Sequence, residues 1–584
     1  MAGINTRQAG GAVRITQFGG IDRRGRVCDI DNLRLRADGS LERRCGFAPA
    51  LVLDGTVRGV WSGSFNGAEA TFAAAGDKLW QLDLDAGTAV GIGNIAAGEE
   101  PVALFLYRGQ LCCIDGSDIY LWDGSTLSTA SPYVPLVARE RDPVDLYNIY
   151  EPINLIGRRA RFSFRADGKN AIFYFGYAVE GIVRLYEATS GSQYLNVEYR
   201  LGTDGYGGSY VAFNSTPDAG SIILAVVTLH AQYYDYARVA ACRRAVVYGG
   251  SYDDRILCWG GESPSEMFCS QPVSAAQVTE ACIWGNESGS LYFPLDCNFR
   301  VGDGQYAVRA ACRHYDRLLV FTDGDTWMAD FSSSVDKQFP VVPINSGVGC
   351  TAPGAAALAG NDPLTVADGA IWRWTSSALR RDECSAKCVS EGIADLFGGQ
   401  FSTGAVVYSF RGRNEVWFAD PSDEAGQVYI YHTGLDAWYR FSGIRADGFF
   451  GWGGDVGFWR GSSFYCFDEG RETDLDEDGE RVIAARLVLD GLDFDGGERM
   501  NHLTRLAMRL AGEYPALSLT LETDLGRVRV LDDAAGGTVG GFALLDHPVR
   551  SGRFRALQLT LETEGIERLR LCGLTLTAEP GTRK

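Results

Sequence analysis

The chain has 584 residues, a formal net charge of −20 and an apolar share of 46%. That length is too great for one hydrophobic core, so we expect two to four domains. The acidic balance, with basic residues few and dispersed, excludes the basic footprint of a nucleic-acid-binding surface. The start shows no signal-peptide pattern and no run of about 18 apolar residues occurs, so we expect no membrane span.

Residues 1–48 are expected to form an extended arm and a hairpin rather than a domain. Residues 32–36 alternate as a strand, residues 37–40 are turn formers, and residues 41–44 form a return strand. In a fold whose small sheets are arranged in a ring, such an arm can supply the strand that the last sheet lacks. It would then close the ring and remove an exposed sheet edge.

Seven times along the chain, a Gly, Asp or Ser turn runs into a short apolar-aromatic strand. The seven segments are 76–80, 117–120, 253–257, 323–327, 368–372, 413–417 and 461–465. Their last residues are 40, 137, 70, 45, 45 and 48 positions apart. A period of about 40–50 residues is typical of a β-propeller with one four-stranded blade per repeat. The sequence therefore predicts an all-β fold with about seven blades, and insertions in the two long intervals.

The predicted organisation has five parts. After the arm of residues 1–48, they are propeller blades at 49–142, an inserted β-domain (platform) at 143–236, further blades at 237–470 with a small insertion at about 262–303, and a C-terminal β-sandwich at 471–584. Residues 180–186 echo the repeat, so one more blade in the inserted part stays open. The small insertion is expected to consist of strand-loop pieces. In the last part, 517–523 and 557–563 alternate apolar and polar residues, which is typical of a sheet with one buried face.

An incomplete calcium motif lies at the start of the last part. Asp474, Asp476 and Asp478 occupy the first, third and fifth positions of a Ca²⁺ loop, with Gly479 at the sixth. The twelfth position, which needs a bidentate carboxylate, is Ala485. We interpret the segment as an acidic hinge between propeller and sandwich, with a cation site as the alternative, and we expect no cofactor.

The cysteines do not form a recognisable framework. There are 15, an odd and scattered set without a secretory signal, so we predict mostly buried reduced thiols. Cys384 with Cys388, and Cys312 with His314, lack the further ligands that zinc needs. The adjacent Cys112 and Cys113 lie in an apolar strand, so we interpret them as core residues rather than a redox pair. The best helical pattern is the short stretch at 384–396.

Catalytic motifs are scarce. The nearest approach to a sialidase Asp box, at 322–327, has the wrong spacing because glycine directly follows the aspartate. No nucleophile elbow, phosphate loop or dinucleotide fingerprint occurs. We therefore expect no enzymatic activity. We interpret Trp80, Trp327, Trp372 and Trp417 as packing residues that share one blade position.

The opening of the chain resembles a known family. Residues 18–22, then Asn32, then the run 38–47 with Arg43, Arg44 and Gly46, are similar to the start of phage tail nozzle and hub proteins of the tail tubular B and packaged-DNA stabilisation types. Cys45 stands where that family commonly has proline. Segments 313–321, 345–350, 478–485, 493–494 and 503–505 are also similar, and the order of the motifs carries the resemblance over most of the chain.

The resemblance implies a virion protein of the phage tail, assembled in the bacterial host cytoplasm. It implies six copies in a ring below the portal and adaptor, with tail fibres as further partners, that retains genomic DNA and conducts it on ejection without sequence preference. An acidic wall agrees with that role, because each neutralised phosphate would add affinity for DNA. Inserted β-domains would offer surfaces to neighbouring copies, and we expect subunits to meet there.

Two other functions remain open. A carbohydrate-binding or carbohydrate-cleaving propeller could act as an adhesin at a tail tip or cell surface. An intracellular propeller scaffold ranks last because the WD-type signature is missing. A ring assembly with acidic side chains turned inward is expected for the virion protein, whereas a monomer that binds and hydrolyses a glycan is expected for the adhesin.

Overall fold

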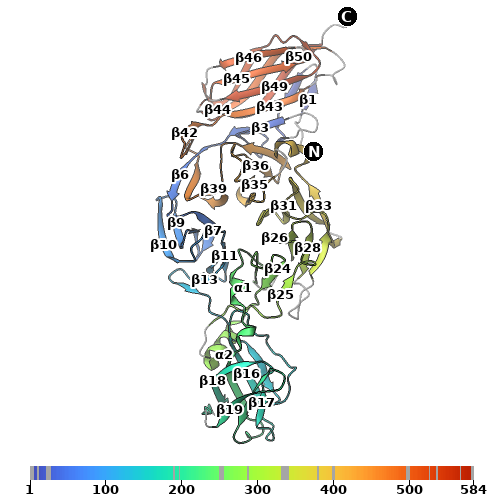
Figure 1. The fold of residues 1–584 in the computed structure, drawn as a ribbon. Helices are drawn as coiled ribbons and strands as arrows, with labels where there is room; N and C mark the ends of the chain where they lie inside the picture. The colour runs from blue at the N-terminus through green and yellow to red at the C-terminus, as the bar shows by residue number, and fades with distance from the viewer. Residues whose placement is uncertain are drawn as a thin grey trace.

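The computed structural model is built almost wholly of short antiparallel strands, which confirms the all-β class (Figure 1). Figure 1 shows a ring of small sheets in the middle and a β-domain at each end. The structure describes residues 6–9, 12–21, 28–188, 191–195, 198–248, 255–285, 289–330, 341–377, 380–397, 401–492, 494, 500–524, 526–534, 537–563, 565 and 567–580.

Seven four-stranded antiparallel units make up the ring within these residues, numbered here 1 to 7 in chain order. Units 1 to 3 are β7 (Val57–Phe65), β8 (Ala68–Ala75), β9 (Lys78–Asp83), β10 (Thr88–Asn94); β11 (Ala103–Tyr107), β12 (Gln110–Ile114), β13 (Ile119–Trp122), β14 (Leu127–Thr129); and β22 (Arg244–Val247), β23 (Ile256–Trp259), β24 (Glu266–Cys269), β25 (Asn298–Arg300). Units 4 and 5 are β26 (Val308–His314), β27 (Arg317–Thr322), β28 (Thr326–Asp330), β29 (Val341–Asn345); and β30 (Ala356–Ala359), β31 (Asp362–Ala367), β32 (Ala370–Ser377), β33 (Arg380–Cys388). Units 6 and 7 are β34 (Val406–Phe410), β35 (Glu415–Ala419), β36 (Val428–His432), β37 (Ala437–Phe441); and β38 (Gly448–Trp452), β39 (Asp455–Arg460), β40 (Ser463–Asp468), β6 (Gly46–Val52).

In six of the seven neighbouring pairs of units, the first strands lie against one another. Strand β7 contacts β11, β11 contacts β22, β26 contacts β30, β30 contacts β34, β34 contacts β38, and β38 contacts β7 again. The last of these contacts brings the end of the ring back to its beginning.

Two-residue turns explain how the short strands reverse. Asn66 and Gly67 between β7 and β8 have φ of 50° and 83°, and Asp368 and Gly369 between β31 and β32 have φ of 51° and 70°. Two positive φ values in succession make the hairpin turn whose twist matches that of the flanking strands, and Asn, Asp and Gly tolerate them best. The turn residues of the repeat thus act through the backbone.

The repeat marks two different strand positions. Three of its tryptophans, Trp80, Trp327 and Trp372, lie on the third strands of their units. Trp417 lies on the second strand of unit 6. Trp417 is fully buried, whereas the other three are only partly buried. The prediction of one shared blade position was therefore wrong. The same turn-strand signal precedes either strand because both follow tight hairpin turns.

The domain between units 2 and 3 consists of two sheets around its own core. Its four-stranded sheet has the order β15 (Leu136–Arg141), β16 (Arg159–Arg165), β21 (Ile222–Leu229), β18 (Val179–Glu187), and its three-stranded sheet is β17 (Ile172–Tyr174), β20 (Ser209–Phe213), β19 (Tyr199–Thr203). Residues Phe162, Phe164, Phe173 and Phe175 fill the space between the sheets. The first strand begins at Leu136, before the predicted boundary at 143.

Short helices connect this domain to unit 3. The segment η1 (Ala231–Tyr233) and helix α1 (Tyr236–Ala240) lead into the unit, and helix α2 (Ala275–Gly285) is inserted between β24 and β25. The expected strand-loop pieces of the small insertion are thus partly helical. The expected helix at 384–396 is instead the end of β33 followed by η2 (Glu391–Phe397), a 3-10 turn.

Two sheets form the C-terminal domain, and the N-terminal arm contributes strands to both. One sheet has the order β1 (Thr6–Ala9), β2 (Ala12–Ile15), β50 (Arg570–Pro580), β44 (Asn501–Tyr514), β47 (Gly537–Pro548), with β4 (Leu33–Leu35), β5 (Leu41–Arg43) and β48 (Arg553–Phe554) at its margin. The other sheet is β3 (Cys28–Asp31), β43 (Ala485–Leu492), β49 (Leu557–Thr563), β45 (Leu517–Thr523), β46 (Gly526–Ala534). Alternate leucines of β45 and β49 are at most 2% exposed.

The arm also joins the C-terminal domain to the ring. Strand β3 pairs in parallel with β37 of unit 6 and antiparallel with β43, so unit 6 continues into the C-terminal sheet. Strand β6 then pairs with β40 as the fourth strand of unit 7. The closing strand β6 begins at Gly46, two residues before the predicted end of the arm.

Candidate functional site

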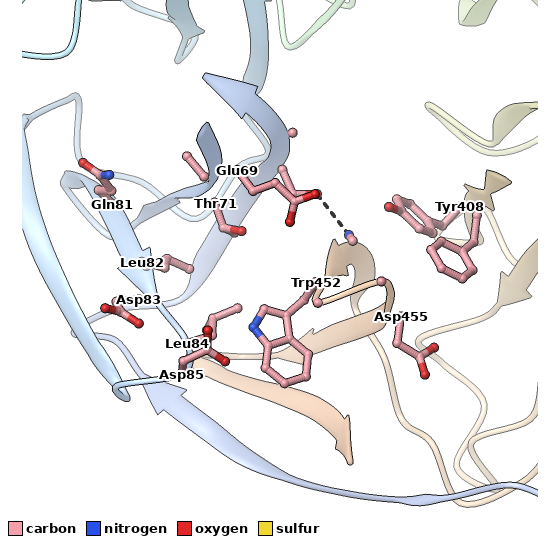
Figure 2. A pocket seen from close by; sticks show the side chains of 17 residues that line it. Glu69, Thr71, Gln81, Leu82, Asp83, Leu84, Asp85, Tyr408, Trp452 and Asp455 are labelled. Atoms are coloured by element: carbon pink, nitrogen blue, oxygen red, sulfur yellow. Dashed lines mark hydrogen bonds between the residues drawn. The ribbon is translucent and has the colours of Figure 1, made fainter. Parts of the chain in front are cut away.

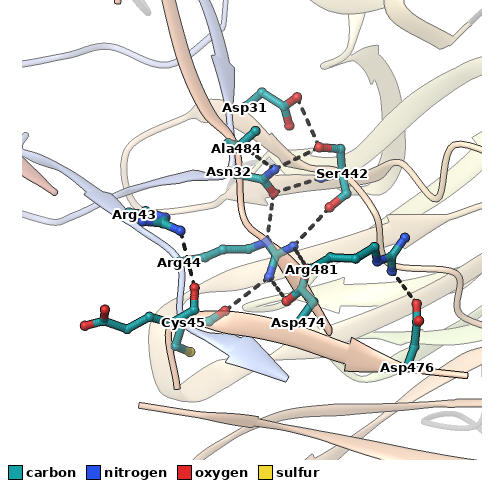
Figure 3. A network of polar contacts seen from close by, with 11 residues as sticks. Asp31, Asn32, Arg43, Arg44, Cys45, Ser442, Asp474, Asp476, Arg481 and Ala484 are labelled. Carbon is teal, nitrogen blue, oxygen red and sulfur yellow. Dashed lines mark hydrogen bonds and ion pairs between the residues drawn. The ribbon is translucent and has the colours of Figure 1, made fainter. Parts of the chain in front are cut away.

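The residues that carry the family resemblance meet where the arm, the ring and the C-terminal domain come together (Figure 3). Asn32 donates from its amide to Ser442 Oγ at 2.9 Å and to the Ala484 carbonyl at 2.8 Å. Its own amide oxygen accepts from Arg44 Nε at 2.8 Å. Asn32 has a φ of 53°, a backbone conformation that asparagine tolerates better than most residues. This cluster of Asn32, Arg44, Ser442 and Asp474 is called the arm junction below.

A buried ion pair lies at the centre of the arm junction. The guanidinium of Arg44 donates to both oxygens of Asp474, at 2.7 and 2.6 Å, and the two side chains are 1% and 6% exposed. Two residues on, Gly46 leaves no room for a side chain, since a Cβ there would lie 2.0 Å from the Thr473 carbonyl oxygen. Arg44 and Gly46 therefore allow the arm to pass closely over residues 473–474.

The acidic segment interpreted as a hinge, with a cation site as the alternative, forms a two-stranded hairpin, β41 (Thr473–Asp476) and β42 (Gly479–Val482). Asp474 points into the arm junction, whereas Asp476 pairs with Arg481 and accepts from the Asp478 backbone N–H at 2.9 Å (Figure 3). Among the described residues, no group of three or more His, Cys, Asp or Glu side chains is placed to hold a metal ion.

The other sequence candidates lie apart from one another. His314 is 3% exposed with Nδ1 at 2.9 Å from the Asn361 carbonyl oxygen, and its neighbour Cys312 is buried in the core. The near-Asp-box carboxylate Asp325 accepts from the Trp327 indole at 2.8 Å within its own turn. Cys112 and Cys113 are fully buried, and Cys384 has a side chain outside the described residues.

Units 1, 6 and 7 enclose a pocket of about 570 Å³ that the sequence did not reveal (Figure 2). Its wall carries the exposed carboxylates of Glu69, Asp83 and Asp85 and the half-buried indole of Trp452. A fourth carboxylate, Asp455, is engaged by Arg413 at 2.7 and 2.8 Å. These residues come from hairpins almost 400 positions apart, so no local motif could have found them.

Burial disfavours ionisation of the hydroxyl on the other side of this pocket. Desolvation raises the pKa of Tyr408, which lies near Ser62. Ser62 Oγ in turn accepts from the Gly451 backbone N–H at 3.0 Å, the contact drawn in Figure 2. A hydroxyl, an indole face and three carboxylates around a pocket of this size can bind a neutral polyhydroxylated ligand or a cation.

The seven first strands of the ring carry no aspartate or glutamate over their described lengths. Their charged residues are Arg58, Arg244, Arg309 and Arg313. Arg58 donates to the carbonyls of Glu100, Gly76 and Ala96, at 2.8, 2.9 and 2.6 Å, and so ties neighbouring loops together. The strands around the middle of one ring are therefore not an acidic wall.

Comparisons with known proteins leave the family open. No protein-family model and no curated protein matches the sequence. Among solved structures, the exo-β-1,3-galactanase of Phanerochaete chrysosporium bound to galactose has a TM-score of 0.25 and 7% identity, over 81% of this chain and 95% of that chain. The extracellular domain of a hybrid two-component system from B. thetaiotaomicron has a TM-score of 0.25 and 9% identity, over 95% of this chain and 85% of that chain. Likeness at these scores carries no argument about function.

No helix in the described part of the chain is long and apolar enough to cross a bilayer.

Proposed function

We propose that this chain is a structural protein of a bacteriophage virion, a nozzle or hub that forms a ring in the tail and serves as conduit and gate for genomic DNA. The observation that carries the proposal is the arm junction. Asn32, Arg44 and Gly46, which carry the family resemblance at the start of the chain, are the residues that join the arm to the ring and to the C-terminal domain.

This placement gives the short motif a physical meaning. Arg44 needs Asp474, 430 positions away, and Gly46 needs the close approach of Thr473. A chain with this motif therefore needs both a ring to close and a C-terminal domain to anchor the arm. We infer that the seven units are the blades of a β-propeller closed by β6. The resemblance implies a propeller, and the turn-strand repeat predicts about seven blades.

Apolar surface supports self-assembly through the inserted domain. Half of the exposed large apolar side chains of the described chain lie within residues 143–236, and five of them are in the single loop that follows β15. They are Val144, Leu146, Tyr147, Ile149, Tyr150, Ile172, Val183, Leu195, Tyr206 and Tyr234. Concentrated exposed apolar surface is typical of protein–protein interfaces.

We propose that the conduit lies between copies rather than through the ring of sheets within one chain. The first strands of a single ring carry arginines and no carboxylates, so an acidic wall facing DNA would have to be built from other surfaces when copies assemble.

Mass photometry and electron microscopy of the purified chain test the proposal. We expect rings whose mass is about six times the 63.4 kDa of the chain, in equilibrium with smaller species on dilution. A 63.4-kDa species at all concentrations, with no rings on the grids even when adaptor protein is added, would overturn the virion role.

A second candidate function rests on the pocket between units 1, 6 and 7. An indole beside carboxylates, as with Trp452, Glu69 and Asp83, is a common arrangement for binding a sugar ring and its hydroxyls. A carbohydrate-binding or carbohydrate-cleaving protein would bind a glycan here, and Trp452→Ala would abolish binding while an exposed substitution in the C-terminal domain, Leu544→Ser, would not. A glycan array and a reducing-sugar assay distinguish binding from cleavage.

A further inference from the structure

A second cavity, of about 690 Å³, lies beside the arm junction, and its charge is opposite to that of the chain. Seven arginines line it, four from the arm, Arg413 from unit 6, and Arg568 and Arg570 from the C-terminal domain. Only three glutamates share the wall. In a protein of net charge −20 this concentration of guanidinium groups stands out, and it is assembled from three separate parts of the fold.

The terminal guanidinium nitrogens of two arm arginines are engaged in structural hydrogen bonds. Arg44 is held by Asn32 and Asp474, as described above. Arg43 donates to the carbonyls of Gly565, Glu567 and Glu472 and has no carboxylate partner among the described residues. Arg43 and Arg44 therefore contribute positive charge to the cavity, but their hydrogen-bond donors are not available to a ligand.

Arg34 differs because its charge is balanced while its donors remain available. The nearest carboxylate oxygen, on Glu415, is 3.6 Å from Nε, beyond hydrogen-bond length. That carboxylate already accepts from Tyr439 Oη at 2.7 Å and Trp417 Nε1 at 3.0 Å. Burial opposes the charge on Arg34, but Glu415 and its neighbours outweigh burial and raise the pKa of Arg34. The end of its guanidinium makes no hydrogen bond to another described residue and can receive a ligand.

Of the remaining arginines, Arg413 is engaged by both oxygens of Asp455, whereas the other three make more exposed contacts. Arg570 pairs with Asp38 at 2.7 Å, where the two side chains are 35% and 54% exposed, and Arg36 pairs with Glu42 at a similarly exposed position. Arg568 donates to the Glu469 carbonyl. Exposed ion pairs contribute little to stability, so these side chains can turn to an anion at low cost.

We propose that this cavity binds a linear phosphate chain, such as tripolyphosphate or the triphosphate group of a nucleotide. Guanidinium groups match the paired oxygens of a phosphate, and the cavity is lined by Arg34 from the arm and by Arg568 and Arg570 from the C-terminal domain. Several phosphates in a row use these donors together, whereas a single phosphate cannot. The ligand would bridge the arm and the C-terminal domain, and would therefore stabilise their junction. This assignment does not depend on the virion role.

Isothermal titration calorimetry and thermal unfolding with sodium tripolyphosphate test the site, with sodium chloride of equal ionic strength as reference. We expect one site per chain and a rise in the unfolding temperature. The double variant Arg568→Gln/Arg570→Gln should weaken binding at least about tenfold. The matched control Arg505→Gln, which breaks the exposed pair with Asp546 on another part of the same sheet, should bind as the native chain does.

Two further measurements complete the test. Adenosine triphosphate should bind at least as tightly as tripolyphosphate, and Arg36→Gln provides a second weakened variant if the double variant unfolds. Absence of binding beyond that of sodium chloride, equal weakening by Arg505→Gln, or equally tight binding of citrate would overturn the proposal.

Discussion

At the scale of single residues, the arm junction shows how a charged motif acquires its role. Arg43 and Arg44 stand in a run of polar residues that looks like a solvated hairpin end, yet both are less than 5% exposed. Their partners come from residues 471–474 and 565–567, far along the chain. The buried charges are tolerated because every donor on Arg44 is matched by an acceptor.

Replacing Arg44 with methionine should therefore destabilise the protein strongly. The substitution leaves the carboxylate of Asp474 buried without its partner, and a broken buried pair costs about 3–5 kcal/mol. Chemical unfolding measured by fluorescence gives the difference in free energy. The double variant Arg44→Met/Asp474→Leu should recover part of that loss, because it removes both charges. A loss for Arg44→Met no larger than that of the exposed-pair variant Arg505→Gln, expected below about 1 kcal/mol, would contradict the importance of the junction.

Cysteine reactivity follows burial rather than sequence neighbourhood. Ten of the thirteen described cysteines are buried, as predicted, and burial raises the pKa of Cys312 and of Cys350 to about 12. The thiolate is the reactive form, so these groups should resist alkylation at pH 8. Cys282, on the exposed side of α2, is the contrast.

Labelling with iodoacetamide followed by mass spectrometry tests this expectation. In the native protein Cys282 should be modified first, and Cys112, Cys113, Cys312 and Cys350 only after denaturation. Rapid native labelling of Cys112 or Cys350 would show that the core around these thiols opens readily.

At the scale of elements, closure of the ring depends on a strand from the other end of the chain. In β6, Phe47 is 1% exposed and makes edge contacts with Phe458, Tyr465 and Phe467, at centroid distances of 5.0, 5.8 and 6.0 Å. Without β6, strand β40 would be an unprotected edge, a template for pairing with another chain.

Phe47→Ala should lower the free energy of unfolding by about 3–5 kcal/mol, since it empties a packed aromatic site. It should also increase aggregation on heating, because β40 becomes exposed more often. Val52→Ala at the end of the same strand, where the side chain is 61% exposed, is the matched control and should have little effect. Similar stability of the two variants would mean that β6 is not what holds the ring closed.

At the scale of the whole molecule, the exposed apolar loop of the inserted domain should control assembly. Tyr147 is 92% exposed and Ile149 is 48% exposed, so replacing them costs the folded monomer little. If copies meet there, the double variant Tyr147→Ser/Ile149→Ser should weaken the association of copies at least about tenfold. This corresponds to about 1.4 kcal/mol for each interface between two copies.

Sedimentation velocity over a concentration series measures this effect. The control is Val90→Ser on β10, a comparably exposed apolar residue of unit 1 outside the inserted domain. If the copies of both variants assemble equally well, the subunit contacts lie elsewhere.

Local signals and long-range contacts differ in what they allow a sequence to predict. Tight turns such as Asn66-Gly67 and alternation such as that of β45 depend on neighbouring residues, so the strands and the all-β class could be predicted. The position of Trp417 on a second strand, and the helix α2 in place of strand-loop pieces, could not, because tertiary packing overrides weak local preferences.

The sequence by itself determined an all-β chain of short strands in repeating turn-strand units. It also predicted an arm with a hairpin at the start and an alternating C-terminal part, because backbone turns and strand alternation are encoded locally. Only the tertiary structure decided which residues meet. It brought Arg44 to Asp474 and gathered Arg34, Arg413 and Arg568 around one cavity. It also assembled the pocket of Glu69 and Trp452. These contacts join segments hundreds of residues apart, and their energies depend on burial and charge that no local pattern records.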